Sequence, residues 1–331
     1  GLKKGVTNAL QQVPVMGDRM IEHIRKTKSS IKQLVVPGMF SEDMGITYLG
    51  PIPGHNLPML CKALKEAKKV EGPVLLHVMT TKGKGYEPAE TAPDKFHGIG
   101  PFDIESGKVL AKKDGDTYTD VFGKVLCDEA SRNPDIVAIT AAMADGTGLA
   151  RFKKHYPNRF FDVGIAEEHG VTFAAGLAAG GLKPVFAVYS SFLQRGYDQL
   201  IHDVALQNLP VVFGVDRAGL VGSDGETHQG IFDLSFLSNI PNMTVMSPKN
   251  KWELADMLRF ALQMNSPVAI RYPRGKAYDG YEGCRERISY GKSEWIFEGK
   301  EIAILSVGHM FEEAVKTRDK LIEQGYEPTL I

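Results

Sequence analysis

The stretch Pro210-Val-Val-Phe-Gly-Val-Asp216 decides the fold class of this chain. Its apolar residues run almost without interruption, which is typical of a strand buried on both faces of a sheet. Similar runs lie at residues 135–140, 184–189, 243–247 and 267–272. Helical patterns separate them, at residues 119–132, 166–180, 191–207 and 251–264. This alternation predicts an α/β domain in which helices cover a doubly wound parallel sheet.

The segment ahead of this domain shows too few elements to close a layered domain of its own. It contains a basic helix at 18–34, a loop rich in Gly and Pro at 50–55, a helix ending near residue 70 and a buried strand at 73–80. The basic helix is typical of a solvated helix face. We therefore expect residues 1–115 to be the last part of a domain.

The end of the chain mirrors its beginning. The pattern predicts a strand at 301–307, a helix at 311–324 and a second strand at 327–331, which together form one βαβ unit. We therefore expect residues 284–331 to be the start of a further α/β domain. One complete domain, residues 116–283, is thus expected between two partial ones. Because the chain starts at Gly1 without Met and stops inside a predicted strand, we expect it to be cut at both ends.

Composition excludes several classes of protein. The 331 residues are 43% hydrophobic and 24% charged, as in a soluble globular protein. A net charge of −1 gives no global attraction to nucleic acid or to an anionic membrane. The longest apolar stretch, 171–182, is shorter than the ~20 residues that span a bilayer. Three scattered cysteines argue against a disulfide framework or a zinc site, and they favour a cytoplasmic setting.

The strongest chemical signal follows the strand at 210–216. In an open α/β sheet, ligands bind in the loops after the carboxyl ends of the strands. The loop at 217–230 holds four glycines together with Arg217, Asp224 and His228. An arginine can bind a phosphate or carboxylate through two hydrogen bonds, and a histidine can transfer a proton near neutral pH. The alternative is an ordinary polar loop held by internal salt bridges.

Other strand ends carry similar candidates. A second candidate loop leads into a helix and reads Asp162-Val-Gly-Ile-Ala-Glu167-Glu168-His169. Its two glutamates would complement the dipole at the start of that helix. Alternatively, one of the two carboxylates is buried, and its pKa is raised enough for acid–base catalysis. The aromatic residues Tyr189 and Phe192 flank Ser190, which is either a simple helix cap or part of a wall for a planar ligand.

Three further loops give weaker signals. Residues 81–86, with Lys84 and Tyr86, follow a strand like a phosphate-binding loop, although their spacing is not that of a P-loop. Arg271-Tyr-Pro-Arg274 would bring a second guanidinium to the same edge of the sheet. His97 is as compatible with a capped loop as with catalysis.

Together these loops resemble the 1-deoxy-D-xylulose-5-phosphate synthase family, which belongs to the transketolase-like enzymes. The resemblance covers nearly the whole chain in order. It is carried by the following motifs: Gly50-Pro-Ile-Pro-Gly-His-Asn56, Thr81-Lys-Gly-Lys-Gly-Tyr-Glu-Pro-Ala-Glu90, Asp162-Val-Gly-Ile-Ala-Glu-Glu-His169, Tyr189-Ser-Ser-Phe-Leu-Gln-Arg-Gly-Tyr-Asp-Gln199, Asp216-Arg-Ala-Gly-Leu-Val-Gly-Ser-Asp-Gly-Glu-Thr-His-Gln-Gly230 and Arg271-Tyr-Pro-Arg-Gly275.

The resemblance implies a thiamine-diphosphate-binding fold and a transferase that condenses pyruvate with glyceraldehyde 3-phosphate and releases CO2. This reaction opens the non-mevalonate route to isoprenoids and also supplies thiamine and pyridoxal precursors. The resemblance also implies that the protein is a homodimer. The middle domain of the chain would then be the pyrimidine-binding domain, after the tail of a diphosphate-type domain and before the start of a transketolase-like C-terminal domain.

The resemblance also implies roles for individual residues. Glu167 would share a proton with the aminopyrimidine ring of the cofactor, and His228 and His97 would lie in the active site. The other matching residues would contact the cofactor (Lys84, Tyr86 and Phe192) or the acceptor substrate (Tyr189, Arg217, Asp224 and Arg274).

One feature of the family has no match. Its members carry, ahead of the matching segment, a Gly-Asp-Gly…Asn stretch that binds Mg2+ and the diphosphate, whereas residues 114–116 and 223–225 are not substitutes. No metal ligand is therefore predicted in this chain, and we expect the chain alone to be inactive. Two alternatives remain: a non-catalytic binding or scaffold subunit that pairs with a separate chain, or another transketolase-like thiamine-diphosphate enzyme.

Overall fold

The computed structural model of the chain describes residues 39–110, 115–222 and 224–331. The chain divides into two compact units, Gly1–Lys112 and Lys113–Ile331. The basic helix predicted at residues 18–34 lies outside the described residues.

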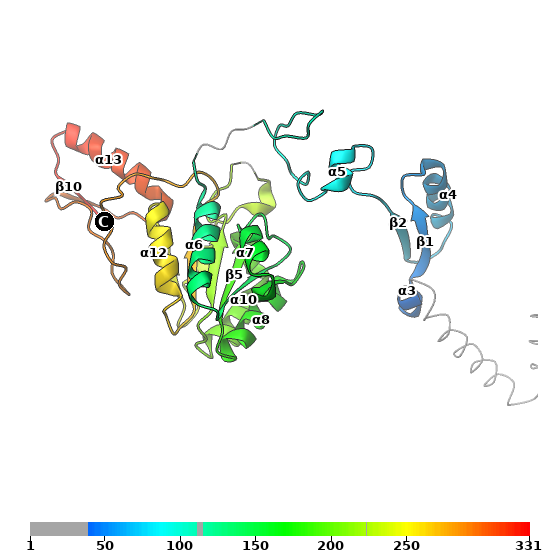
Figure 1. Ribbon diagram of the computed structural model, residues 1–331, viewed down its shortest axis with the longest axis horizontal. Coiled ribbons are helices and arrows are strands. Elements are labelled where there is room, and N and C mark those ends of the chain that lie inside the picture. Colours follow the sequence, from blue (N-terminus) through cyan, green and yellow to red (C-terminus); the bar gives the residue numbers. More distant parts are fainter. Residues whose placement is uncertain (1–38, 111–114, 223) are drawn as a thin grey trace, which may run out of the picture. The chain divides into compact units, whose positions relative to one another are not determined.

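The first unit contains a parallel pair of strands, β1 (Thr47–Pro53) and β2 (Val74–Met79), connected through α4 (Leu57–Ala67) (Figure 1). The short helices α3 (Met39–Asp43) and α5 (Glu87–Thr91) precede and follow them. The prediction of a loop at 50–55 is wrong for its first four residues, which belong to β1. Prolines are compatible with this strand because it lies at a sheet edge, and the pairing register shifts between Leu49 and Ile52.

The second unit is built on a six-stranded parallel sheet of order β4-β3-β5-β6-β8-β7, which confirms the predicted fold class. The strands are β3 (Ile136–Thr140), β4 (Phe160–Asp162), β5 (Lys183–Tyr189), β6 (Val212–Asp216), β7 (Thr244–Met246) and β8 (Val268–Arg271). The sequence did not predict β4, because three residues are too few to show a period. The last residues of β5 and β6, Tyr189 and Asp216, are paired in register, so the polar loops after them start side by side.

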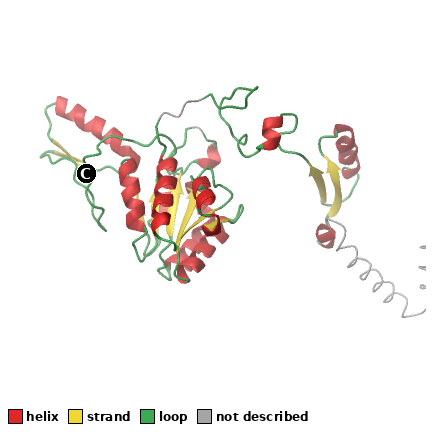
Figure 2. Ribbon diagram, viewed as in Figure 1, coloured by secondary structure: helices red, strands yellow, loops and turns green. Residues whose placement is uncertain are grey.

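Helices cover both faces of this sheet (Figure 2). They include α6 (Tyr118–Arg132), α7 (Ala150–His155), α8 (Glu167–Ala179), α11 (Asp233–Leu237) and α12 (Lys251–Ala261). Neighbouring residues of one strand enter opposite cores: Val185 packs in the cluster that contains α6 and α12, whereas Phe186 packs in the cluster that contains α8. Burial on both faces explains why the strand sequences are apolar throughout.

The helix predicted at residues 191–207 is divided in the structure. It consists of α9 (Ser190–Leu193), η2 (Gln194–Gly196), α10 (Tyr197–Gln199) and the π-helical segment η3 (Leu200–Ala205). Gly196 packs closely against α8, since a β-carbon there would lie 2.8 Å from Val171 Cγ2. The change of helical geometry occurs at this contact, which apolar periodicity does not reveal.

The C-terminal part of the second unit contains the predicted βαβ arrangement. Strands β9 (Ile302–Ile304) and β10 (Pro328–Leu330) pair in parallel, with α13 (Phe311–Glu323) between them in sequence. Both strands are shorter than predicted. A turn of 3₁₀ helix, η5 (Gly308–Met310), leads into α13. Within the described part of the chain, no helix combines the length and the apolar character needed to cross a membrane.

Two helical glycines give a matched test of packing. A β-carbon on Gly123 of α6 would lie 2.2 Å from the Gly148 carbonyl oxygen, whereas one on Gly176 of α8 would meet no atom within 4 Å. We expect Gly123→Ala to lower the free energy of unfolding by about 1–3 kcal/mol, and Gly176→Ala to raise it by up to about 1 kcal/mol. Urea unfolding measures both, and equal effects of the two substitutions would contradict the close approach of α6 to Gly148.

Candidate active site

The carboxyl edge of the six-stranded sheet gathers the predicted residues of the second unit. Glu167 follows β4, Tyr189 ends β5, Arg217 follows β6 and Arg274 follows β8. Since all strands are parallel, these ends meet at one edge.

Glu167 is the first residue of α8, and its side chain is only 3% exposed. Its Oε1 accepts a hydrogen bond from Arg195 Nη1 at 3.2 Å, while its Oε2 is buried and has no hydrogen-bond partner. The neighbouring Glu168 is exposed. Of the two carboxylates considered from the sequence, Glu168 therefore suits the helix dipole, and Glu167 is a buried acid with one unsatisfied oxygen.

Three rings cluster beside this acid. Tyr189 and Phe192 stack with their centroids 5.5 Å apart, and His228 lies 5.1 Å from Phe192 and 6.1 Å from Tyr189. The Arg195 guanidinium lies 5.2 Å from the Phe192 ring, so Arg195 contacts both Glu167 and the cluster. Ser190 does not act as a helix cap: its hydroxyl is buried without a partner. Tyr189 and Phe192 therefore lie together, and their role as a wall for a planar ligand stays a prediction.

Arg217 lies almost buried at the start of the loop after β6, with a left-handed backbone φ of +59°. Its Nη1 donates to the Gly146 carbonyl at 2.6 Å and pairs with Asp216 Oδ1 at 3.1 Å. Its guanidinium carbon lies 4.1 Å from the centre of the Tyr189 ring. Burial raises the pKa of the Tyr189 hydroxyl, an effect that the charge of Arg217 partly opposes. Tyr189 is therefore a neutral hydrogen-bonding group at pH 7.

The remainder of the loop is closed on itself. Gly219 and Gly230 exchange backbone hydrogen bonds of 2.7 and 2.9 Å, and the Gln229 side chain bonds both the N–H and the carbonyl of Val221. Asp224 forms an ion pair with Arg274, which brings the loop after β8 to the loop after β6. The alternative of a polar loop with internal salt bridges thus holds in part, because Asp224 and Arg274 pair with each other.

The other arginine of the Arg-Tyr-Pro-Arg motif has a different environment. Arg271 is buried and bonds both carboxylate oxygens of Asp233 in α11, at 2.9 and 3.2 Å. Sequence reasoning did not assign this pair, although a charged residue at the end of an otherwise apolar strand is a signal for a buried partner. Breaking such a pair costs roughly 3–5 kcal/mol, so Arg271 supports the loop structurally.

Three predicted site residues belong to the first unit. Lys84 pairs with Glu90 at 3.5 Å. The Tyr86 hydroxyl donates to the Ile104 carbonyl at 2.7 Å, and its ring packs against Phe96. His97 is exposed. The contacts given for Lys84 and Tyr86 are with other residues of the first unit. The active-site roles of Lys84, Tyr86 and His97 stay predictions.

The chain is similar to known proteins along nearly its whole length. Residues 115–278 match the model of the transketolase pyrimidine-binding domain, and residues 1–80 match that of 1-deoxy-D-xylulose-5-phosphate synthase. The synthase of Lachnoclostridium phytofermentans is 55% identical over 99% of the chain, and that of Caldanaerobacter subterraneus subsp. tengcongensis is 54% identical over all of it. The chain belongs to the 1-deoxy-D-xylulose-5-phosphate synthase family.

The chain spans about half the length of these curated relatives, 53% in both cases. Among solved structures, a split-gene transketolase described as an inactive β4 tetramer is 28% identical with a TM-score of 0.60, over 65% of this chain and 70% of that one. A transketolase from Pichia stipitis, 18% identical with a TM-score of 0.56 over 65% of this chain and 34% of that one, shares the fold.

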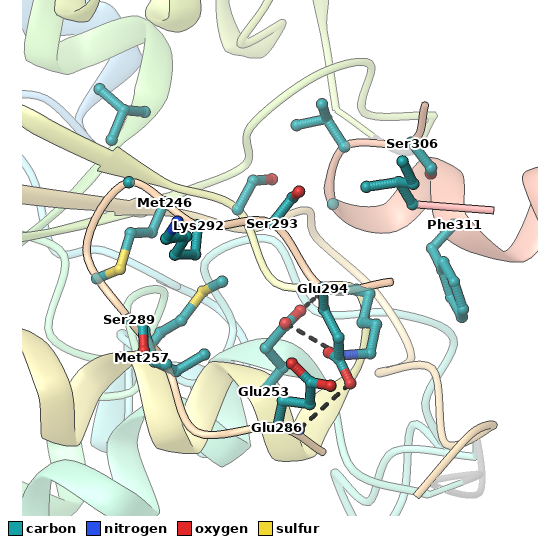
Figure 3. Close-up of a pocket in the computed structure, with 18 of the residues that line it drawn as sticks. Met246, Glu253, Met257, Glu286, Ser289, Lys292, Ser293, Glu294, Ser306 and Phe311 are labelled. Atoms are coloured by element: carbon teal, nitrogen blue, oxygen red, sulfur yellow. Dashed lines mark hydrogen bonds and ion pairs between the residues drawn. The ribbon is translucent and has the colours of Figure 1, made fainter. Parts of the chain in front are cut away.

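A cavity of about 800 Å³ lies elsewhere in this synthase-family chain, beside α12 and the segment after residue 285 (Figure 3). Glu253, Glu286 and Glu294 gather at one side of it, where buried Lys249 pairs with Glu253 and Glu294. None of the predicted site residues that the structure describes lines this cavity. Among the described residues, no three or more His, Cys, Asp or Glu side chains are arranged so that they could hold a metal ion, and these glutamates are no exception.

Proposed function

We propose that the complete protein is a 1-deoxy-D-xylulose-5-phosphate synthase that uses thiamine diphosphate. In this reaction pyruvate loses its carboxyl group as CO2, and the remaining two-carbon unit bonds to the aldehyde carbon of glyceraldehyde 3-phosphate. The observation that carries the proposal is the buried Glu167 carboxylate, whose Oε2 has no partner, beside the cluster of Tyr189, Phe192 and His228. The product would feed isoprenoid synthesis.

These residues fit the pyrimidine half of the cofactor. A buried polar atom without a partner is costly, and a proton shared with a ring nitrogen of the cofactor would satisfy Glu167 Oε2. Bound thiamine diphosphate supplies an electron sink for the loss of CO2. Glu167 would hold and release a proton at Oε2, and Phe192 would pack on the pyrimidine ring. Lys84 and Tyr86 are proposed as further cofactor contacts.

The acceptor would bind at the loop after β6. Arg217 and Arg274 are the proposed partners of its phosphate, because guanidinium groups match phosphate oxygens in pairs. Tyr189, Asp224 and His228 would lie near the hydroxyls and aldehyde, with His228 transferring a proton. Since Arg274 pairs with Asp224, phosphate would compete with that carboxylate. His97 is proposed as a further active-site histidine.

We also propose that residues 116–283 are the pyrimidine-binding domain, between parts of a diphosphate-type domain at 1–115 and of a C-terminal domain at 284–331. Supporting this, the pyrimidine-domain model matches residues 115–278. Mg2+ is proposed to bind with the diphosphate, whose charge calls for a cation with oxygen ligands. In the part of the chain that the structure describes, no cluster of His, Cys, Asp or Glu side chains is arranged to hold the ion.

A cytoplasmic homodimer is the proposed assembly. Ile165, two residues before Glu167, is 84% exposed, so its side chain is available to pack against a second copy of the chain. Charge and cysteine usage fit the cytoplasm and offer no feature for nucleic acid or membrane.

The direct test is turnover by the complete protein. With thiamine diphosphate and Mg2+, pyruvate and glyceraldehyde 3-phosphate should yield CO2 and 1-deoxy-D-xylulose 5-phosphate in equal amounts. Unphosphorylated glyceraldehyde is the matched control and should react far less well at equal concentration. Equal rates with both aldehydes would contradict the proposed acceptor site.

A second candidate is a subunit that pairs with a separate chain. It is favoured by the similarity to the split-gene transketolase, which is described as inactive as a β4 tetramer. Reading the coding sequence upstream distinguishes the two candidates: a separate reading frame for the diphosphate-binding part would support pairing, and a continuous frame would exclude it.

A further inference from the structure

The conformation of Arg217 requires an explanation. Its φ of +59° lies in the left-handed region, which is unfavourable for a residue with a β-carbon. Its side chain is also nearly buried, although an arginine is rarely buried without partners. Neighbouring groups must therefore fix both the backbone and the guanidinium.

The carboxylate of Asp216 meets both needs. It is fully buried, and its Oδ1 accepts a hydrogen bond of 2.7 Å from the Arg217 backbone N–H and pairs with Arg217 Nη1 at 3.1 Å. One oxygen atom thus contacts the strained backbone and the guanidinium of the same residue. A shift of this carboxylate would release both.

The second oxygen of Asp216 is held from another element. Its Oδ2 accepts a hydrogen bond of 2.8 Å from the hydroxyl of Thr119, which lies in the first turn of α6. Thr119 is 97 residues away in sequence and belongs to no motif considered above. The link therefore connects α6 to the loop after β6 across the end of the sheet.

Arg217 has one hydrogen-bond donor that is unused in the structure. Its Nη1 is used by Gly146 and Asp216, and its face by Tyr189. Its Nε is buried and has no hydrogen-bond partner. A buried N–H without an acceptor is costly, so Arg217 has one donor that the protein itself does not satisfy.

We propose that Asp216 and Thr119 are positioning residues, which hold Arg217 in the conformation that binds the phosphate of the acceptor substrate. The inference rests on the proposed function and adds two residues to it. Neither residue touches the reacting atoms; Thr119 orients Asp216, and Asp216 orients Arg217.

The chain of contacts has a characteristic pH dependence. Burial raises the pKa of Asp216, although Arg217 and Thr119 both oppose this shift. The hydroxyls of Tyr189 and Tyr272 also face this carboxylate: burial raises their pKa values, and the charge of Asp216 raises them further. As pH falls through its pKa, Asp216 becomes neutral and the pairing with Arg217 weakens. Removing the Thr119 hydroxyl raises that pKa further, so the weakening begins at a higher pH.

Thr119→Val tests the proposal in the complete protein because it removes the hydroxyl and keeps the shape. We expect the KM for glyceraldehyde 3-phosphate to rise roughly tenfold, as for loss of one hydrogen bond to a charged group, with the KM for pyruvate changed less than about twofold. The acid limb of kcat/KM for the phosphorylated substrate should move to higher pH. Thr119→Ser should restore both values.

The matched control is Thr140→Val. Thr140 is a fully buried threonine at the end of β3, and its hydroxyl bonds a backbone carbonyl instead of a carboxylate. It should leave the two KM values in their original ratio. Stabilisation by inorganic phosphate in thermal unfolding, measured without cofactor, gives a readout besides activity, and it should be reduced in Thr119→Val alone.

The outcomes separate the inference from the function on which it rests. Equal losses for both substrates in Thr119→Val, or an unchanged KM, would overturn the positioning role. Because KM does not depend on the fraction of folded enzyme, partial unfolding of the variant does not obscure this result. If Arg217→Ala also leaves the KM for glyceraldehyde 3-phosphate unchanged, the proposed phosphate site itself is wrong.

Discussion

Replacing Glu167 by glutamine should reduce turnover by roughly 10²–10⁴-fold while the protein stays folded. Glutamine has nearly the same shape but cannot take up and return a proton at the position of Oε2. That atom is the one that lacks a partner in the structure. The loss should appear in kcat, because a general acid or base acts in the chemical step.

The stability of the Glu167→Gln variant should change little. Its partner Arg195 is 52% exposed, so water can solvate the guanidinium once the negative charge is gone. Glu168→Gln is the matched control, an exposed neighbour on the same helix turn, and should keep its activity. Steady-state kinetics and thermal unfolding of both variants provide the measurement. Near-normal turnover of Glu167→Gln would contradict the proposed role.

Replacing Arg217 by alanine should raise the KM for glyceraldehyde 3-phosphate by roughly 10–150-fold, as expected for losing a charge-assisted hydrogen bond of about 1.5–3 kcal/mol. The KM for pyruvate, which has no phosphate, should change little. The substitution also leaves Asp216 buried without its counter-charge, which raises the pKa of that carboxyl further, so Asp216 becomes more readily protonated.

Arg259→Ala serves as the control for Arg217→Ala. Arg259 is a partly exposed residue of α12 that pairs with Glu129 and Asp256, away from the carboxyl edge of the sheet. Its loss should leave both KM values unchanged. A similar loss for pyruvate and for glyceraldehyde 3-phosphate in Arg217→Ala would mean that this arginine supports the site as a whole and not the phosphate alone.

The fold was predictable where strands are buried on both faces. Residues 210–216 and 184–189 read as apolar runs because helices cover β5 and β6 on each side. Apolar runs did not reveal β1, because this strand lies at a sheet edge and contains Gly50, Pro51 and Pro53. They did not reveal β4 either, because its three residues are too few to show a pattern. Propensity is a weak guide at edges because few neighbours constrain such strands.

The candidate site was predictable as a set of loops but not as a set of contacts. The motifs around Glu167, Tyr189, Arg217 and Arg274 are continuous in sequence and follow strand ends, so their chemistry is visible residue by residue. Arg195 and Asp233 were missed as partners of Glu167 and Arg271 because the members of each pair are 28 and 38 residues apart. No local pattern records such pairings.

By itself the sequence determined the parallel α/β architecture, the edge of the sheet at which polar residues collect, and the family. These features depend on local order along the chain: apolar runs, glycines in loops and motifs of neighbouring residues. Only the tertiary structure decided which charges are buried and with whom. Asp216 became the support of Arg217 because Thr119, 97 residues earlier, meets it inside a core where a carboxylate needs every hydrogen bond it can form.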